Sequence, residues 1–189
     1  MKKLIWFLLP FILCFTFQDD YFIRLSEAAI ERTTHKERYD GQYRKIKYPG
    51  GDVPDSIGVC TDVIIRAYRK VGSDLQVLIH EDMKKAKAEY DKRRKTDKLD
   101  ASIDHRRTQN METFFTRQGA KLAITRKAED YKPGDIVFFD VAYGHVGMVV
   151  NRRSADNKRF MIVHNIGRGT ELEDFLFEAT ITGHYRWKP

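Results

Sequence analysis

The chain contains little cysteine, and this scarcity excludes a fold held together by disulfides. Only Cys14 and Cys60 occur among its 189 residues. Cys14 lies in a segment that resembles a removable export signal, so the mature protein would keep Cys60 alone. A single thiol cannot form an internal disulfide. Cys60 is therefore a candidate for a chemical role, and it is the residue on which the functional hypotheses below depend.

The chain also lacks an apolar run long enough to cross a bilayer. The uncharged run at the N-terminus extends from Leu4 to Phe17, whereas a spanning helix needs about 20 apolar residues. Two lysines precede this run and two aspartates follow it, as in a secretion signal. We therefore predict a signal peptide at residues 1–18 and a single domain at residues 19–189. No small-x-small motif precedes Gln18, so an uncleaved anchor is the alternative, and it would be the only contact with a membrane.

A strong charge of one sign is missing from most of the chain. The formal net charge is +7, but residues 84–98 alone hold eight basic and three acidic residues, 8 − 3 = +5. A local excess of this kind argues against a nucleic-acid partner. The segment is either a solvated helix and loop or a rim that attracts an anionic polymer such as cell wall. We place it in a charged helical insertion near residues 75–110.

Hydrophobic periodicity and turn residues predict helices in the first two thirds of the chain and strands in the last third. Internal repeats and low-complexity linkers are absent. This order, with short gaps between the strands, predicts an α+β fold with an antiparallel sheet. The expected helices cover residues 22–38, about 56–71, 75–95 and 105–118, and the expected strands cover residues 136–139, 145–150, 160–166 and 184–187.

Cys60 is predicted to lie in the first turn of its helix. The helix dipole there favours negative charge, and a neighbouring imidazolium would also lower the pKa of the thiol. The backbone amides of the first turn have no helical partner and could hold the oxyanion of an acyl-transfer intermediate. The alternative is a buried cysteine that acts only as a small hydrophobic side chain.

Two histidines in strand-like segments are candidate partners of the thiol. His145 follows Gly144 and opens a strand, where it could act as a base and where the glycine leaves room for a substrate. His164 or Asn165 could orient that base. These two side chains point to opposite faces of a strand, and both faces carry apolar residues, so the periodicity does not choose between them. The alternative is histidines that serve only local structure.

The motifs of the chain resemble those of a bacterial domain family of unassigned function, which is grouped with the NlpC-type cysteine peptidases of cell walls. The resemblance covers about residues 45–187, nearly the whole mature chain. It implies a papain-like, NlpC-type fold in which N-terminal helices, with the cysteine at a helix N-terminus, precede an antiparallel sheet. The motifs are YPGGDVP, GVCTDV, HEDM, IDHRR, PGDIVFF, GHVGMV, HNIG and ITGHYR.

The resemblance also implies roles for individual residues. Cys60 matches the nucleophile, His145 the general base and His164 the residue that orients the base. Tyr48, ahead of a glycine pair, is similar to a tyrosine that helps NlpC-type sites bind the oxyanion. The chain departs from the usual Asp-Cys-Ser-Gly pattern, because residues 59–62 are Val-Cys-Thr-Asp.

Other polar residues are candidates for binding the substrate. Arg106 and Arg107 are expected either to form ion pairs or to bind substrate carboxylates, for which guanidinium groups are well suited. Asn165 is a further candidate at the oxyanion or substrate. The groups His80-Glu81-Asp82 and Asp104-His105 match no compact zinc pattern. We expect no metal and no cofactor.

Together these features imply an exported cysteine amidase or peptidase in the periplasm or cell envelope of a bacterium. The expected substrate is an amide bond in peptidoglycan stem peptides. One alternative keeps the Cys-His site but uses it as an acyltransferase or thioesterase on a lipid or small amide. Another is a cell-wall binding module without activity, which contacts the wall through residues 84–98. The sequence leaves the oligomeric state open.

Overall fold

The computed structural model describes residues 21–90, 98–142 and 144–189. The predicted signal peptide with Cys14, and the most basic part of the 84–98 segment, lie outside the described residues. Within the described ranges, no helix is long and apolar enough to cross a membrane.

The four α-helices of the described residues all lie in the first two thirds of the chain, as predicted. The predicted helix at residues 22–38 ends earlier than expected, because the chain turns after residue 32 and residues 38 and 39 pair as a strand. Residues 57 and 58, expected at the start of the second helix, also form a strand. The helices are α1 (Tyr21–Arg32), α2 (Cys60–Lys70), α3 (Leu75–Lys85) and α4 (Thr108–Arg117), with the 3-10 turns η1 (Lys87–Glu89), η2 (Asp104–Arg106) and η3 (Ala128–Asp130).

An antiparallel sheet of five strands follows the helices. Its strand order is β6-β5-β4-β3-β7. Residues 136–139 form a strand as predicted, whereas β6 and the short parallel pair β1-β2 were not predicted. The strands are β1 (Arg38–Tyr39), β2 (Ile57–Gly58), β3 (Ile136–Phe139), β4 (His145–Arg153), β5 (Phe160–His164), β6 (Glu171–Glu173) and β7 (Ile181–Tyr185).

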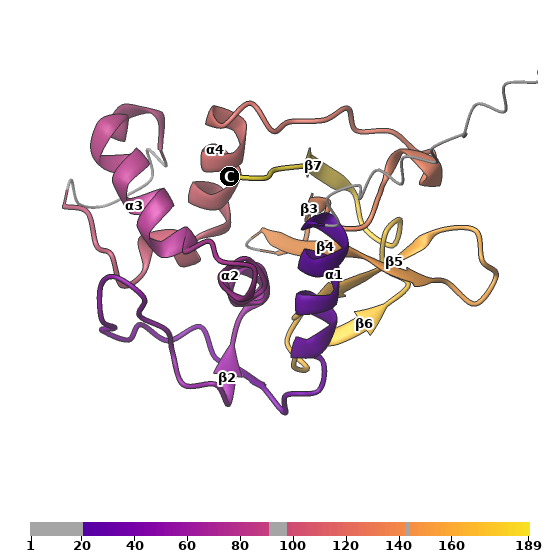
Figure 1. The fold of residues 1–189 in the computed structure, drawn as a ribbon, viewed down its shortest axis with the longest axis horizontal. Helices are drawn as coiled ribbons and strands as arrows, with labels where there is room; N and C mark the ends of the chain where they lie inside the picture. The colour runs from indigo at the N-terminus through magenta and orange to yellow at the C-terminus, as the bar shows by residue number, and fades with distance from the viewer. Residues whose placement is uncertain (1–20, 91–97, 143) are drawn as a thin grey trace, which may run out of the picture.

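The helices α3 and α4 lie on one side of the molecule and strands β4, β5 and β6 on the other, with α2 between them and α1 against the sheet (Figure 1). Both α1 and α2 pack against β4, and α4 packs against β7. The main core lies at this junction and includes Ile64 of α2, Phe115 of α4 and Met148 of β4, all fully buried. The predicted α+β class with an antiparallel sheet is confirmed, and the papain-like order of a helical half followed by a sheet is present.

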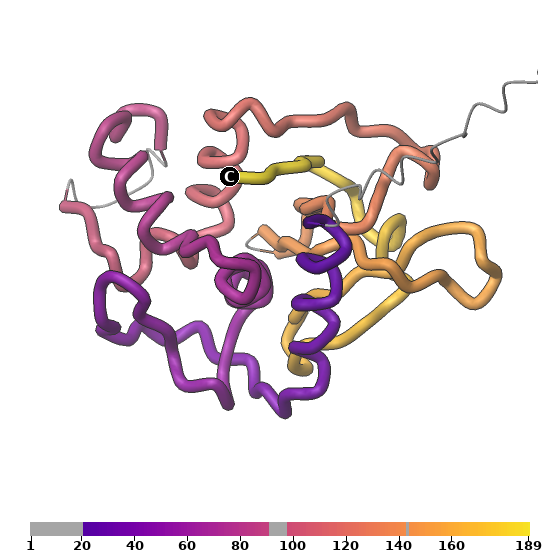
Figure 2. Tube along the Cα trace, viewed as in Figure 1, coloured from indigo at the N-terminus to yellow at the C-terminus, as the bar shows by residue number. Residues whose placement is uncertain are grey.

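The segment between β1 and β2 makes an excursion toward α3 before it returns to the start of α2 (Figure 2). The side chain of Gln76 in α3 holds it: Gln76 accepts a hydrogen bond from the Gly51 amide at 2.9 Å and donates to the Lys47 carbonyl at 2.9 Å. These hydrogen bonds fix the position of the segment that leads through β2 to Cys60.

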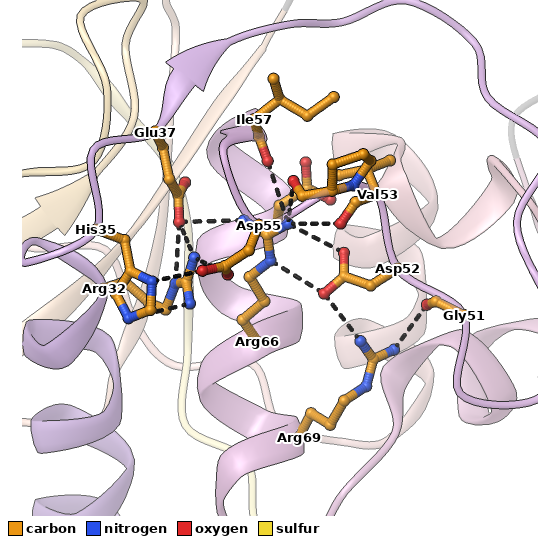
Figure 3. A network of polar contacts seen from close by, with 12 residues as sticks. Arg32, His35, Glu37, Gly51, Asp52, Val53, Asp55, Ile57, Arg66 and Arg69 are labelled. Atoms are coloured by element: carbon orange, nitrogen blue, oxygen red, sulfur yellow. Dashed lines mark hydrogen bonds and ion pairs between the residues drawn. The ribbon is translucent and has the colours of Figure 1, made fainter.

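A network of ion pairs anchors both ends of this excursion to α2 (Figure 3). At its centre, Arg66 donates to Glu37 at 3.1 Å, to Asp52 at 3.0 Å and to the Ile57 carbonyl at 3.1 Å. The Glu37 side chain is fully buried and also accepts from Arg32. Because a buried carboxylate is stable only when it is paired, this network fixes the segment that leads into Cys60.

Candidate active site

Cys60 is the first residue of α2, as the sequence predicts. Val59 before it is extended, and the helix begins because the Asp62 carboxylate accepts a hydrogen bond from the Val59 amide at 2.7 Å. An acidic residue at the third helical position that binds the amide before the helix is half of a capping box. The local sequence therefore places the thiol at the positive end of α2.

A buried ion pair holds this helix start against η2. The Arg106 guanidinium donates to both oxygens of Asp62, at 2.8 and 2.7 Å, and both side chains are 2% exposed. Thr61 donates to the Arg106 carbonyl at 2.9 Å. Arg106 was predicted either to pair or to bind substrate, and the structure supports pairing. Its guanidinium is occupied by Asp62 and positions Cys60.

The Cys60 thiol is buried, with 6% of the residue exposed. Burial raises the pKa of the thiol to about 11, and the Asp62 carboxylate adds to this rise. The Val146 amide, which donates to the sulfur, and the amides of the first turn act in the opposite direction. The expected lowering of the thiol pKa is therefore wrong for this structure, because the cost of desolvating a thiolate exceeds the stabilisation by the helix end.

The two predicted histidines are brought together with a glutamate that the sequence analysis missed. His145 Nε2 lies 2.8 Å from His164 Nδ1, and His164 Nε2 lies 2.7 Å from Glu173 Oε2. The three residues belong to the neighbouring strands β4, β5 and β6. Gly147 makes the close approach of β5 possible, because a Cβ at this position would lie 2.5 Å from an Ile162 methyl group. The only sequence signal for Glu173 was the alternation Glu-Leu-Glu at residues 171–173, which is too short to predict a strand.

Both histidines are neutral near pH 7. Burial lowers the pKa of His145 to about 4, with a smaller contribution from His164. Burial also lowers the pKa of His164, although the Glu173 carboxylate opposes this shift. A buried imidazole loses hydration that its charged form needs more than its neutral form.

The carboxylate at the end of this chain sets the tautomer of each ring. An ionised Glu173 can only accept, so His164 carries its proton on Nε2 and presents Nδ1 as an acceptor. His145 must then donate from Nε2, which leaves its Nδ1 as the nitrogen with a free lone pair. In this arrangement His145 is therefore the ring that can accept a proton.

His164, and not Asn165, is the residue that contacts His145. Asn165 is fully buried on the other side of the strand end. Its amide group donates to the Gly58 carbonyl at 3.4 Å, and its oxygen accepts from the Gly167 amide at 3.2 Å. The prediction of an oxyanion or substrate role for Asn165 is corrected: it supports the chain just before Cys60.

A cavity of about 320 Å³ opens beside the thiol, and Tyr39 and Gly144 line it together with Cys60. The pKa of Tyr39 is raised, first by burial and then by the charges of Cys60 and Asp62. The Tyr39 hydroxyl is therefore within electrostatic reach of the thiol. A larger cavity of about 410 Å³ lies along α1. Cys60 lines only the smaller of these two cavities, so we assign the site to it.

The structure corrects the prediction for Tyr48. This residue donates its hydroxyl to Glu81 at 2.8 Å and packs on the His80 ring. It is held there by the excursion between β1 and β2, and it does not line the Cys60 cavity. Tyr39 lines the cavity instead, and its only sequence signal was Gly41 two residues later.

Arg107 lines the same cavity and is exposed, so it remains a candidate for binding substrate. Among the described residues, no group of three His, Cys, Asp or Glu side chains could hold a metal ion. The groups around His80 and Asp104 accordingly do not assemble into such a site in that part of the chain.

Comparison with known proteins places the chain in a family. A family model described as a domain of unknown function (DUF1287) matches residues 26–187. The uncharacterized protein YijF of Escherichia coli (strain K12) is 44% identical over 151 residues, which cover 79% of this chain and 73% of that protein.

Two solved structures are more distant matches. NlpC1 from Trichomonas vaginalis matches 88% of this chain with a TM-score of 0.46 and 15% identity. A protein from Staphylococcus aureus, described as similar to lipoprotein, NLP/P60 family, matches 90% with a TM-score of 0.41 and 14% identity. The chain spans less than half the length of either protein, 44% and 42%.

Proposed function

Since the chain belongs to the family described as a domain of unknown function (DUF1287), and that description carries no activity, we propose from the site itself that the protein is an exported cysteine hydrolase that cleaves an amide bond in peptidoglycan stem peptides. The observation that carries this proposal is the unbroken chain from Glu173 through His164 to His145, the residue directly before Val146, whose amide donates to the Cys60 thiol at the start of α2. A cysteine that served only as a core side chain would need none of these three partners.

In the proposed mechanism, His145 removes the thiol proton while the sulfur attacks the carbonyl carbon. The thiol pKa of about 11 and the imidazole pKa of about 4 mean that the resting pair is neutral. A preformed thiolate–imidazolium pair is therefore not the starting state, and proton transfer accompanies the attack as general base catalysis. The lone pair on His145 Nδ1, left free by the tautomers above, is the acceptor of this proton.

The remaining steps use the same groups. The oxyanion of the tetrahedral intermediate would be held by the Cys60 backbone amide at the start of α2 and by the Tyr39 hydroxyl, in place of Tyr48. His145 then returns the proton to the leaving amine, and water hydrolyses the thioester, with His145 as its base. His164 and Glu173 keep His145 in the productive tautomer throughout. No step requires a cofactor.

The choice of substrate rests on the sequence. The predicted export signal would deliver the protein to the cell envelope, where the amide bonds of peptidoglycan are abundant. The motifs around Cys60, His145 and His164 resemble those of NlpC-type wall peptidases. Both points support the proposal, and the substrate is decided by assay.

The test is digestion of purified peptidoglycan by the protein that begins at residue 19, with released fragments separated by liquid chromatography and identified by mass. We expect new amino and carboxyl ends in the stem peptides from the wild type and none from Cys60→Ala or His145→Ala. His35→Ala, which removes an imidazole paired with Asp55 on the surface, is the matched control and should remain active.

Cleavage that persists in Cys60→Ala would refute the mechanism. If wall fragments are absent but an acyl group is released from a lipid or a small amide, the site serves acyl transfer or thioester hydrolysis instead. Salt-sensitive binding to the wall that is unchanged in Cys60→Ala would favour the binding module.

A further inference from the structure

The cavity beside Cys60 lies between the N-termini of two helices. Val59 and Cys60 belong to the start of α2, and Arg107 and Thr108 to the start of α4. Each helix N-terminus carries a partial positive charge and backbone amides without helical partners. At α4, the residue that caps the helix is Arg107 itself, and its side chain makes no capping hydrogen bond. The helix ends alone would not define a site, but the charged side chains around the cavity also favour an anion.

Two charged side chains line this cavity, those of Arg106 and Arg107. Only the charge of Arg106 is neutralised by a carboxylate. Arg106 forms its two hydrogen bonds to Asp62 and is 6% exposed. Arg107 is exposed, and no carboxylate of the described chain lies within ion-pair distance of it. Most other arginines of the described residues pair with a carboxylate, as Arg66, Arg117 and Arg159 illustrate. Arg126 and Arg153 instead lie over phenyl rings. The cavity therefore keeps a net positive charge next to the thiol.

We infer that Arg107 forms an anion subsite, and that the group bound beside the scissile amide carries a carboxylate. The guanidinium is planar and matches a carboxylate with two parallel hydrogen bonds. Gly144 packs directly against the start of α4 where both line the cavity: a Cβ on this glycine would lie 2.9 Å from the Thr108 hydroxyl, so a larger residue would displace the helix start that carries Arg107. The identity of the bound group as a substrate rests on the proposed function, whereas the preference for an anion does not.

Alkylation of Cys60 tests the subsite without any substrate. Iodoacetate and iodoacetamide react alike: the sulfur bonds to the methylene carbon, iodide leaves, and the thiol proton passes to base. They differ in that only iodoacetate carries a carboxylate. We expect the wild type to favour iodoacetate over iodoacetamide more strongly than N-acetylcysteine does in the same buffer. Arg107→Gln should lower the iodoacetate rate about fivefold, as expected for an exposed charge pair, and change the iodoacetamide rate less than twofold.

Three comparisons make the result decisive. Arg107→Lys keeps the charge and should retain most of the preference. Arg152→Gln removes an equal charge from the surface pair with Glu27 and should leave both rates unchanged. Added salt should reduce the preference of the wild type, because exposed charges are screened.

An iodoacetate preference no greater than that of N-acetylcysteine, or one that survives in Arg107→Gln, would overturn the subsite. An equal loss of both rates in that variant would also overturn it, since it would indicate a structural effect. These outcomes are separate from the peptidoglycan assay: cleavage without an anion preference would refute only the subsite, and an anion preference without cleavage would refute only the proposed function.

Discussion

Replacing Glu173 by alanine should slow the chemistry of Cys60 although the two residues do not touch. Glu173 Oε2 lies 2.7 Å from His164 Nε2, a distance typical of a hydrogen bond to an ionised group. Without this acceptor, His164 can move its proton to Nδ1 and point it at His145. His145 would then lose the free lone pair on which proton transfer depends.

The size of the effect follows from the exposure of the pair. A hydrogen bond to a charged partner contributes about 1.5–3 kcal/mol. The His164 side chain is fully buried, but the Glu173 side chain is 30% exposed, so water can replace part of the lost interaction. We therefore take the lower end, about 1.5 kcal/mol, which corresponds to a roughly tenfold lower rate.

The assay is the rate of peptide release from peptidoglycan, with iodoacetamide labelling of Cys60 as a second readout. Glu173→Gln should retain more activity than Glu173→Ala, because an amide oxygen can still accept from His164. Glu171→Ala is the matched control: this carboxylate is on the same strand and, like Glu173, pairs with Arg168, but Glu173 accepts the hydrogen bond from His164. A rate in Glu173→Ala equal to that of the control would refute the tautomer reasoning.

The structure makes three other predictions. Asp62→Ala should cost about 3–5 kcal/mol in urea unfolding, because it leaves a buried guanidinium unpaired, whereas Glu27→Ala at the exposed pair with Arg152 should cost less than about 1 kcal/mol; equal costs would contradict this. Burial holds the pKa of His145 at about 4, below its unfolded value, so the unfolded state binds more protons as the pH falls from 6.5 toward 4 and stability is lost. Melting curves should show a shallower pH dependence in His145→Gln, and an unchanged slope would count against a buried neutral ring. The iodoacetamide rate of Cys60 should continue to rise well above pH 8.5, because burial raises the thiol pKa to about 11; a plateau near pH 7 would indicate a preformed thiolate instead.

Much of the scaffold could be predicted because its signals are local. The strand at residues 136–139 follows a Pro-Gly-Asp turn and contains only apolar residues, and the structure has the strand at these positions. The placement of Cys60 in a first helical turn depends on nearby turn residues and on Asp62, all within a few positions along the chain. The order of cysteine, first histidine and second histidine was also visible in the motifs.

The composition of the site could not be predicted in full, because it depends on contacts between distant segments. Periodicity could not choose between His164 and Asn165, since both faces of β5 are covered and each side chain is buried. Tyr39 replaces Tyr48 because Gln76 in α3 holds the excursion between β1 and β2 away from the cavity. Strands of two or three residues, such as β1, β2 and β6, have too little periodicity to be seen in a sequence.

The pKa of the Cys60 thiol also depends partly on local sequence and partly on tertiary packing. Local sequence alone accounts for its position at a helix end, which favours the thiolate. Burial acts in the opposite direction and prevails. It is produced in part by the packing of α2 against β4, which begins 85 residues after Cys60 (145 − 60 = 85). The sequence therefore specifies which residues can react, whereas tertiary packing sets their protonation, since desolvation is the sum of contacts that no local pattern contains.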